Sequence, residues 1–136
     1  MERALQDRLR SSLSEVLGSV YNRPAVDWNE RKSNDKSAFP AIVLSTVSPG
    51  QTYSQDGPDE LAVPRIRLEI FDLTALSVKA SKAAAKAVME TPAQYGDIEF
   101  SRSRLAFERD SDPDDLPGGM KVFRTILDFF VPNSPL

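Results

Sequence analysis

The segment from Val63 to Glu90 changes its hydrophobic period in the middle, and this change limits the possible folds more than any other feature of the sequence. Apolar and polar residues first alternate from Arg65 to Asp72, as in a strand that is buried on one face. Small and apolar residues then recur at spacings of three and four, which places them on one stripe of a helix. The predicted stripe consists of Leu76, Ala80, Ala83, Ala84, Ala87 and Val88.

The residues at both ends of this helical pattern are typical of helix ends. Thr74 can cap the N-terminus, because a threonine oxygen accepts a hydrogen bond from a free backbone N–H. Pro92 marks the C-terminal end, since proline cannot continue a helix. The stripe is mostly alanine, and small side chains let a helix axis lie close to a sheet. We therefore expect a helix over 75–90 that lies flat on the preceding strand.

A second amphipathic helix is predicted at the start of the chain, over 1–20. Its leucines and valines recur at spacings of three and four, with charged residues on the opposite side. The apolar side contains Leu5, Leu9, Leu13, Val16, Leu17 and Val20, and the charged side contains Arg3, Asp7, Arg8 and Arg10. The sequence Asn22-Arg23-Pro24 ends the pattern, and a polar loop follows over 30–36.

Four further segments have strand character. Ala25–Asn29 carries the only tryptophan, and the sequence leaves its pairing with the sheet open. Phe39–Val47 is apolar, and Pro40 near its start indicates an edge or a strand beginning. Ile98–Arg109 and Met120–Val131 both alternate. The second of these carries bulk on both faces, which places it in the centre of the sheet or against a partner.

Together these elements predict a single α+β domain over 1–136. The expected order is α-β-β-β-α-β-β, with both helices packed on one face of a mostly antiparallel, curved, four- to five-stranded sheet. The strands within 39–72 form a hairpin with a long mobile loop at 48–62, which is rich in turn-forming residues. The strands within 97–131 form a second hairpin with an acidic tip at 110–119.

The composition excludes several classes of chemistry. The 136 residues include no cysteine and no histidine, so the chain lacks a thiolate, a disulfide and the commonest general base. The net charge of -3 comes without a basic run that would bind nucleic acid. No apolar run approaches the roughly 20 residues of a membrane span, and the first residues do not resemble a signal peptide. We therefore expect no enzyme, cofactor or metal site.

The acidic segment is the strongest candidate for a site. Asp110, Asp112 and Asp114 have the spacing that opens a calcium-binding loop. However, Asp115 stands where that loop needs glycine, and Lys121 stands where it needs a bidentate glutamate. We therefore interpret the segment as a solvated hairpin tip, or as a tip that binds a basic surface of a partner.

Structural interpretations account for the remaining charged and small residues. Gly118-Gly119 lacks the lysine and hydroxyl residue of a phosphate loop and indicates a turn. Lys79, Lys82 and Lys86 have helical spacing and are interpreted as a solvated face, with a phosphate-binding role as the alternative. Four arginines form a basic strip on one sheet face, or pair across strands with glutamates. The arginines are Arg65, Arg67, Arg102 and Arg104, and the glutamates are Glu69, Glu99 and Glu108.

Four segments form a pattern with a family resemblance. They are FPAIVL at Phe39–Leu44, PRIRLEIFD at Pro64–Asp72, the small-residue helix Ser77–Val88, and RLAFERD followed by the acidic segment and FRTILDFFV. Together they resemble the tail terminators, small tail-completion proteins of long-tailed bacteriophages that also occur in gene transfer agents and prophage tail clusters. The resemblance covers roughly Phe39 to Val131 and consists of strand and helix patterns without catalytic signatures.

The resemblance implies a structural protein of the virion, with two helices on a curved sheet and no active site or cofactor. Such proteins assemble as a homohexameric ring on the head-proximal end of the tail tube, either in solution or only on the tail. The ring stops tube polymerisation and offers a docking surface to the head–tail connector or stopper protein. Duplex DNA passes through the lumen without specific binding, and no membrane is involved. The implied location is the tail–neck junction of a virion that is assembled in the bacterial cytoplasm.

We expect the contacts of such a ring to come mainly from the two long loops. The acidic tip or the loop at 48–61 would face the lumen or the tube end, since a net acidic wall repels DNA phosphates. Phe129 is added to these candidates, although Phe129-Phe130 is interpreted first as part of the core and an interface is the alternative. The candidate interaction residues are Gln51, Tyr53, Gln55, Asp56, Asp59, Asp110, Asp112, Asp114, Asp115 and Phe129.

The sequence leaves other functions open. A neck or stopper protein belongs to the same structural class, and the sequence does not separate it from a terminator. A ferredoxin-like regulatory module would need a pocket with convergent polar groups, and no motif indicates one. A hydrolase or transferase would lack histidine, cysteine and a phosphate loop in this chain.

Overall fold

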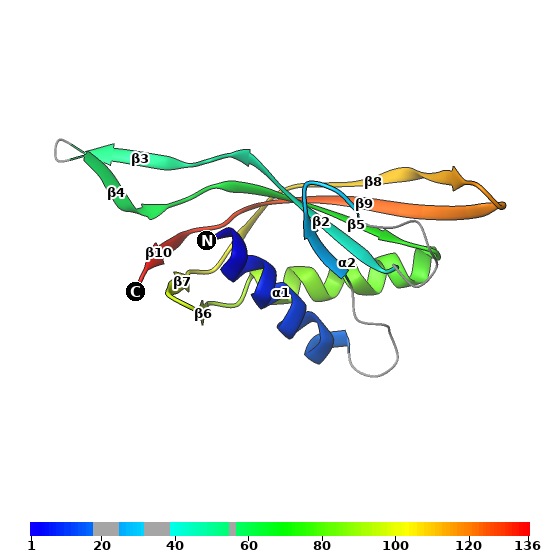
Figure 1. The fold of residues 1–136 in the computed structure, drawn as a ribbon, viewed down its shortest axis with the longest axis horizontal. Helices are drawn as coiled ribbons and strands as arrows, with labels where there is room; N and C mark the ends of the chain where they lie inside the picture. Colours follow the sequence, from blue (N-terminus) through cyan, green and yellow to red (C-terminus); the bar gives the residue numbers. More distant parts are fainter. Residues whose placement is uncertain (18–24, 32–38, 55–56) are drawn as a thin grey trace.

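The computed structural model describes residues 1–17, 25–31, 39–54 and 57–136 (Figure 1). The helices are α1 (Glu2–Leu17) and α2 (Ala75–Met89). The strands are β1 (Ala25–Trp28), β2 (Ala41–Ser48), β3 (Gln51–Ser54), β4 (Gly57–Ala62), β5 (Arg65–Asp72), β6 (Ala93–Tyr95), β7 (Ile98–Phe100), β8 (Arg104–Leu116), β9 (Met120–Phe130) and β10 (Asn133–Pro135). Asn22-Arg23-Pro24, which were predicted to end the first helix, lie outside the described part, and so does most of the polar loop over 30–36.

Five strands form the main sheet, in the spatial order β1-β2-β5-β9-β8. β1 runs parallel to β2, which settles the pairing that the sequence left open, and the other neighbouring pairs are antiparallel. Both helices lie on the same side of this sheet (Figure 1). The helices and the main-sheet strands follow the order α-β-β-β-α-β-β, so the predicted fold class is confirmed. β9 lies inside this sheet, between β5 and β8, which agrees with one of its two predicted placements.

A second sheet that the sequence did not predict continues from the first, in the order β3-β4-β10-β7-β6. The segment 48–62, which was predicted as a loop, contributes the antiparallel strands β3 and β4. The strand predicted over 98–109 is divided between the two sheets, because β7 pairs with β6 and β10 while β8 pairs with β9.

Prolines mark the places where long strands pass from one sheet to the other. Pro49 lies between β2 and β3, Pro64 between β4 and β5, and Pro132 between β9 and β10. Proline has no backbone N–H and therefore interrupts the hydrogen-bond ladder. The seam is still bonded, since the N–H of Val131 donates to the oxygen of Pro64 at 2.9 Å and the N–H of Ser101 donates to that of Pro132 at 3.0 Å. We call this line of three prolines the proline seam.

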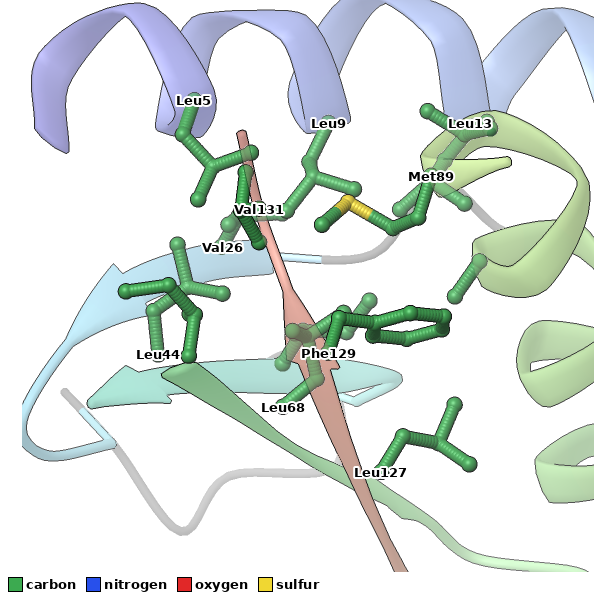
Figure 2. Close-up of a cluster of buried hydrophobic side chains, with 14 of the residues drawn as sticks. Leu5, Leu9, Leu13, Val26, Leu44, Leu68, Met89, Leu127, Phe129 and Val131 are labelled. Carbon is green, nitrogen blue, oxygen red and sulfur yellow. The ribbon is translucent and has the colours of Figure 1, made fainter. Parts of the chain in front are cut away.

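The main core lies between the helices and the sheets (Figure 2). Leu5, Leu9 and Leu13 of α1 are fully buried, as the helical pattern predicts, and point toward the strands. The alternation in β5 is also confirmed, because its apolar set faces the helices. The fully buried residues of that set are Ile66, Leu68 and Ile70. The side chains of Val16, Leu17 and Val20 lie outside the described part.

The N-terminal cap of α2 is the predicted one, but its buried face is not. The Oγ1 of Thr74 accepts a hydrogen bond from the N–H of Ser77 at 3.2 Å. Leu76 is 69% exposed, and Ala83 and Ala87 are exposed as well, so the predicted stripe is wrong at these positions. Eight of the fifteen residues of this helix are alanine or serine and occur on several sides of it, so the spacing allowed two neighbouring stripes. The buried residues are Val78, Ser81, Ala84, Ala85, Val88 and Met89.

The predicted charged side of α1 is wrong at Arg8, which is only 1% exposed. Its guanidinium donates hydrogen bonds to the backbone oxygens of Val88 and Thr91, at the C-terminal end of α2. It also lies over the ring of Phe100, 5.2 Å from the ring centroid. The last carbonyls of a helix have no partners within the helix, so Arg8 supplies donors that the end of α2 needs.

β8 and β9 form a hairpin that continues through the acidic segment. The expected loop at 110–119 is mostly strand, since β8 extends to Leu116. Only residues 117–119 form the turn, with positive φ angles of 86° at Gly118 and 76° at Gly119. A register shift between Ser111 and Asp114 bulges this strand. The aspartates with calcium-loop spacing therefore lie along an extended ribbon.

Candidate protein interaction site

Two hairpins project from the body of the molecule in opposite directions (Figure 1). The β3–β4 hairpin, which we call the arm, extends from one end of the molecule. The β8–β9 hairpin extends from the other end, and we call its distal part, residues 112–119, the acidic tip. Each copy of the chain thus presents two different projecting surfaces.

The carboxylates of the acidic tip are free. Asp112, Asp114 and Asp115 are exposed, and within the described residues none of them makes a hydrogen bond or ion pair. The apolar side chains of Leu116 and Met120 lie beside them at the turn and are half-buried. Both pack against a buried cluster of the same chain that includes Phe71 and Val122, so the tip presents mainly unpaired negative charge.

Asp110, in contrast, is bound within the chain. Its Oδ1 accepts hydrogen bonds from the Oγ1 of Thr125 at 2.7 Å and from the Nζ of Lys82 at 3.4 Å. The Thr125 hydrogen bond is the main reason why the pKa of Asp110 is lowered. Glu108 lies 2.6 Å from the Nζ of Lys86, whose hydrogen bond likewise lowers the pKa of Glu108. These two lysines were predicted as a solvated face, but they attach α2 to β8.

A groove of about 690 Å³ lies where the end of α2, the segment between β7 and β8, and the end of β9 meet. We call it the basic groove. Arg102 and Arg104 are exposed on its wall, with Glu90 as the one carboxylate among its lining residues. The lining residues are Val63, Glu90, Arg102, Ser103, Arg104, Leu105, Phe130 and Pro132.

The groove holds a polar atom without a partner. Ser103 is only 2% exposed, and its backbone N–H donates to the oxygen of Met89 at 3.0 Å. Its side-chain Oγ makes no hydrogen bond within the described part of the chain. Beside it, the guanidinium of Arg104 lies over the ring of Phe130, 5.2 Å from the ring centroid. A ligand in this groove would meet two cations, a free hydroxyl and an aromatic ring.

The predicted basic strip is only partly present. Arg65 and Arg67 lie on the face of the main sheet opposite the helices and bind the same carboxylate, that of Asp128. The distances are 2.9 Å from Arg65 Nη2 to Oδ2 and 2.8 Å from Arg67 Nε to Oδ1. Burial alone would raise the pKa of Asp128, but the hydrogen bonds from both arginines lower it overall. The expected glutamate partners are not used by these two residues, although Arg124 lies 3.6 Å from Glu69.

The other predicted interaction residues have different positions. Phe129 is fully buried in the core, because odd-numbered residues at this end of β9 face the helices. Its neighbour Phe130 is the aromatic residue that reaches the groove. Gln51 and Tyr53 lie in β3 and Asp59 lies in β4, but their side chains are outside the described part. Gln55 and Asp56 lie outside it altogether.

A metal site and a membrane-spanning helix each have requirements that can be compared with the described residues. They contain no group of three or more acidic residues that could hold a metal ion. Neither described helix has the length and apolar character needed to cross a membrane. The buried charged side chains among the described residues are Arg8, Asp72 and Asp128, and each has hydrogen-bond partners within the chain.

The fold and its surfaces define a small α+β protein with two projecting hairpins and a basic groove. No protein-family model and no curated protein matches the sequence. The structure is similar to that of a chain in the virion of a native gene transfer agent (GTA) particle, with a TM-score of 0.64 and 14% sequence identity. The similarity covers 98% of this chain and 94% of that chain, so the fold is shared over almost the full length of both.

Proposed function

We propose that this chain is a structural protein of a phage-like virion that forms a ring on the head-proximal end of a tail tube. The ring stops tube polymerisation and gives the head or its connector a surface to bind. The observation that carries the proposal is the shared fold with a chain of a gene transfer agent virion, over 98% of this chain. The sequence patterns that resemble tail terminators support the same assignment independently.

The shape of the molecule supports assembly into a ring. A closed ring of identical copies needs two different surfaces on each copy, which meet head to tail. The arm and the β8–β9 hairpin project in opposite directions, so each copy has such surfaces at its two ends (Figure 1). In the proposed hexamer the β8–β9 hairpin lies at the contact between copies, and the arm stays available for the tail tube.

The proposed partners are the tail tube protein, the head–tail connector and further copies of the chain. We assign the arm to the tube, since an exposed two-stranded ribbon has free edges that can pair with another protein. Duplex DNA would pass through the lumen without specific contacts, and the proposed location is the tail–neck junction. This assignment needs no cofactor or catalytic residue.

Electron microscopy of particles made without this chain tests the proposal. Overlong or irregular tails beside detached, filled heads are expected, because nothing would stop the tube from growing. Tails of normal length on heads that leak DNA would instead make the chain a stopper in the neck. Normal infectious particles would overturn a role in the virion, and binding of a small ligand would then be tested with a metabolite panel.

A further inference from the structure

We infer that the acidic tip of one copy binds in the basic groove of a second copy. The inference rests on the proposed ring and names the residues that join its subunits. Its occupant is a second copy of this chain, because both complementary surfaces are present on every copy. The contact would be head to tail, since the tip and the groove are different surfaces.

The charges of the two surfaces are complementary and unpaired. On one side, Asp112, Asp114 and Asp115 are exposed and make no ion pair within the described chain. On the other side, Arg102 and Arg104 are exposed and make no ion pair within that part either. Arginine binds carboxylates through paired hydrogen bonds, so the groove offers the donors that the tip lacks.

The groove also has features that fit the rest of the tip. The buried Oγ of Ser103 has no partner in the described chain and can donate a hydrogen bond to a carboxylate. Leu105 and Phe130 provide apolar walls for the exposed Pro117 at the turn. An isolated solvated tip would need none of these features.

A single copy cannot make this contact with itself. Arg104 and Phe130 form the first cross-strand pair of the β8–β9 hairpin, and Leu116 and Met120 form the last. Twelve residue steps, from 104 to 116, separate the two ends of β8. β9 covers the same distance in ten steps, from 130 to 120, because β8 is bulged at two places, so at about 3.3 Å per residue the stiff ribbon is about 33 Å long. The tip therefore points away from its own groove and must find the groove of another copy.

Disulfide crosslinking tests the contact, because the chain contains no cysteine and each introduced thiol is unique. Equal amounts of the purified variants Asp114→Cys and Arg102→Cys are mixed and oxidised. A crosslinked dimer is expected from this mixture. A mixture of Asp114→Cys with Arg109→Cys is the matched control, since Arg109 is an exposed arginine on the same strand as Arg104 but outside the groove. Equal crosslinking in both mixtures would overturn the inference.

Charge reversal provides a second test that does not depend on crosslinking. One variant carries Asp112→Lys, Asp114→Lys and Asp115→Lys, and the other carries Arg102→Glu and Arg104→Glu. Each is expected to self-associate at least about tenfold more weakly than the wild type in sedimentation velocity at low salt, because like charges would face each other. The two variants mixed, or all five changes in one chain, are expected to restore association.

The matched controls for charge are Asp97→Lys and Arg109→Glu, which make the same kind of change at exposed sites away from the contact. They are expected to associate like the wild type. Association that is absent in the wild type, or that is lost in the variants without rescue by the swap, would overturn the inference. If the tip bound purified tail tubes but no second copy, the tip would belong to the tube contact instead.

These outcomes are separate from those for the proposed function. The crosslinking and sedimentation experiments use the purified chain alone, whereas the tail phenotype requires particles made without the chain. Rescued association together with normal tails would retain the contact and reject the terminator. Overlong tails without any contact between tip and groove would do the opposite.

Discussion

Arg8 is a buried cation whose hydrogen bonds go to the backbone at the end of α2, beside Phe100. One nitrogen of its guanidinium, Nη1, has no partner among the described residues, and burial lowers the pKa of the group. We expect Arg8→Met to lower the free energy of unfolding by about 2 kcal/mol, because two carbonyl oxygens at the helix end lose their donor. Urea unfolding of the full chain measures this change.

The matched control for this substitution is Arg3→Met. Arg3 lies on the same helix with a side chain that is 94% exposed, so its replacement is expected to change stability by less than about 0.5 kcal/mol. Equal losses in the two variants would contradict a special role for Arg8.

Asp128 connects stability to pH. Its pKa is lowered in the folded chain, so its contribution is fully present above the unfolded value of about 3.9 and is lost as the pH falls through the lower folded value. We expect Asp128→Asn to cost about 2 kcal/mol at pH 7 and to reduce the loss of stability on acidification below about pH 4. Urea unfolding at pH 7 and pH 3 measures both effects.

Some acid sensitivity is expected to remain in Asp128→Asn, since hydrogen bonds also lower the pKa values of Glu108 and Asp110. The exposed Asp97 provides the control, and Asp97→Asn should leave both stabilities nearly unchanged. A pH dependence of Asp128→Asn identical to that of the wild type would contradict the assignment.

At the scale of elements, Gly50 sets the path of the chain from β2 into the arm. Its φ angle is +60°, and a Cβ at this position would lie 2.0 Å from the carbonyl oxygen of Val63. We expect Gly50→Ala to lower the free energy of unfolding by at least about 3 kcal/mol, since neither backbone can move without losing the hydrogen bond between Val63 and Gly50. Thermal unfolding measures the loss.

Gly96→Ala is the matched control for Gly50→Ala. Gly96 has a similar φ angle of +58°, but a Cβ there would meet no atom within 4 Å. Gly96→Ala therefore measures only the cost of placing a side chain at a positive φ angle, which is expected to be about 1 kcal/mol. If the two substitutions had equal effects, the close approach at Val63 would have no energetic importance.

Elements that are buried on one face were predictable from the sequence, whereas elements exposed on both faces were not. The alternation in β5 and the leucines of α1 follow the core, so their periods were visible in the sequence. The distal part of β8 has the sequence Ser111-Asp112-Pro113-Asp114-Asp115, which shows no alternation, and the side chains from Asp112 to Asp115 are all exposed. Strand pairing there comes from β9 across the hairpin and not from any local pattern.

The rotation of α2 shows a second limit. A helix made largely of alanine has nearly the same apolar character on neighbouring faces, so its own sequence does not select one. The salt bridges from Lys82 and Lys86 to Glu108 on β8 lie along one side of this helix. Lys82 stands three positions before the buried Ala85, and Lys86 stands three positions before the buried Met89. The sequence did not show which carboxylate each lysine binds.

At the scale of the whole molecule, the arm can be tested as the part that contacts the tube. Gln51 pairs with Ala62 at the base of the arm, so residues 52–61 can be replaced by an Asn-Gly turn that closes this pair. We expect the shortened chain to fold, with a melting temperature within a few degrees of the wild type, but not to co-sediment with purified tail tubes. Circular dichroism and co-sedimentation check the two parts of this expectation.

Co-sedimentation of the shortened chain at the wild-type level would remove the arm from the tube contact. The chain with the reversed acidic tip serves as a comparison, because its arm is intact and its change lies at the other end of the molecule (Figure 1). It is expected to retain binding to the tube as a single copy.

The candidate site was only half predictable. The acidic tip is a local run of aspartates and was visible in the sequence, although Asp110 belongs to a structural cluster. The basic groove combines residues near 63, 90, 102–105 and 130–132, which only the fold brings together. Its one local signal was the pair of arginines on either side of Ser103, and the sequence gives no sign that this serine is buried.

The proline seam has a consequence for how the molecule opens. Pro49, Pro64 and Pro132 remove amide hydrogens at the line where the two sheets meet, so fewer hydrogen bonds couple one sheet to the other than couple strands within each sheet. Backbone amides are therefore expected to exchange with deuterium as two blocks, with slow exchange in β5 and β9 beneath the helices and faster exchange in β3 and β4. A single exchange rate across the seam would mean that the two sheets unfold together.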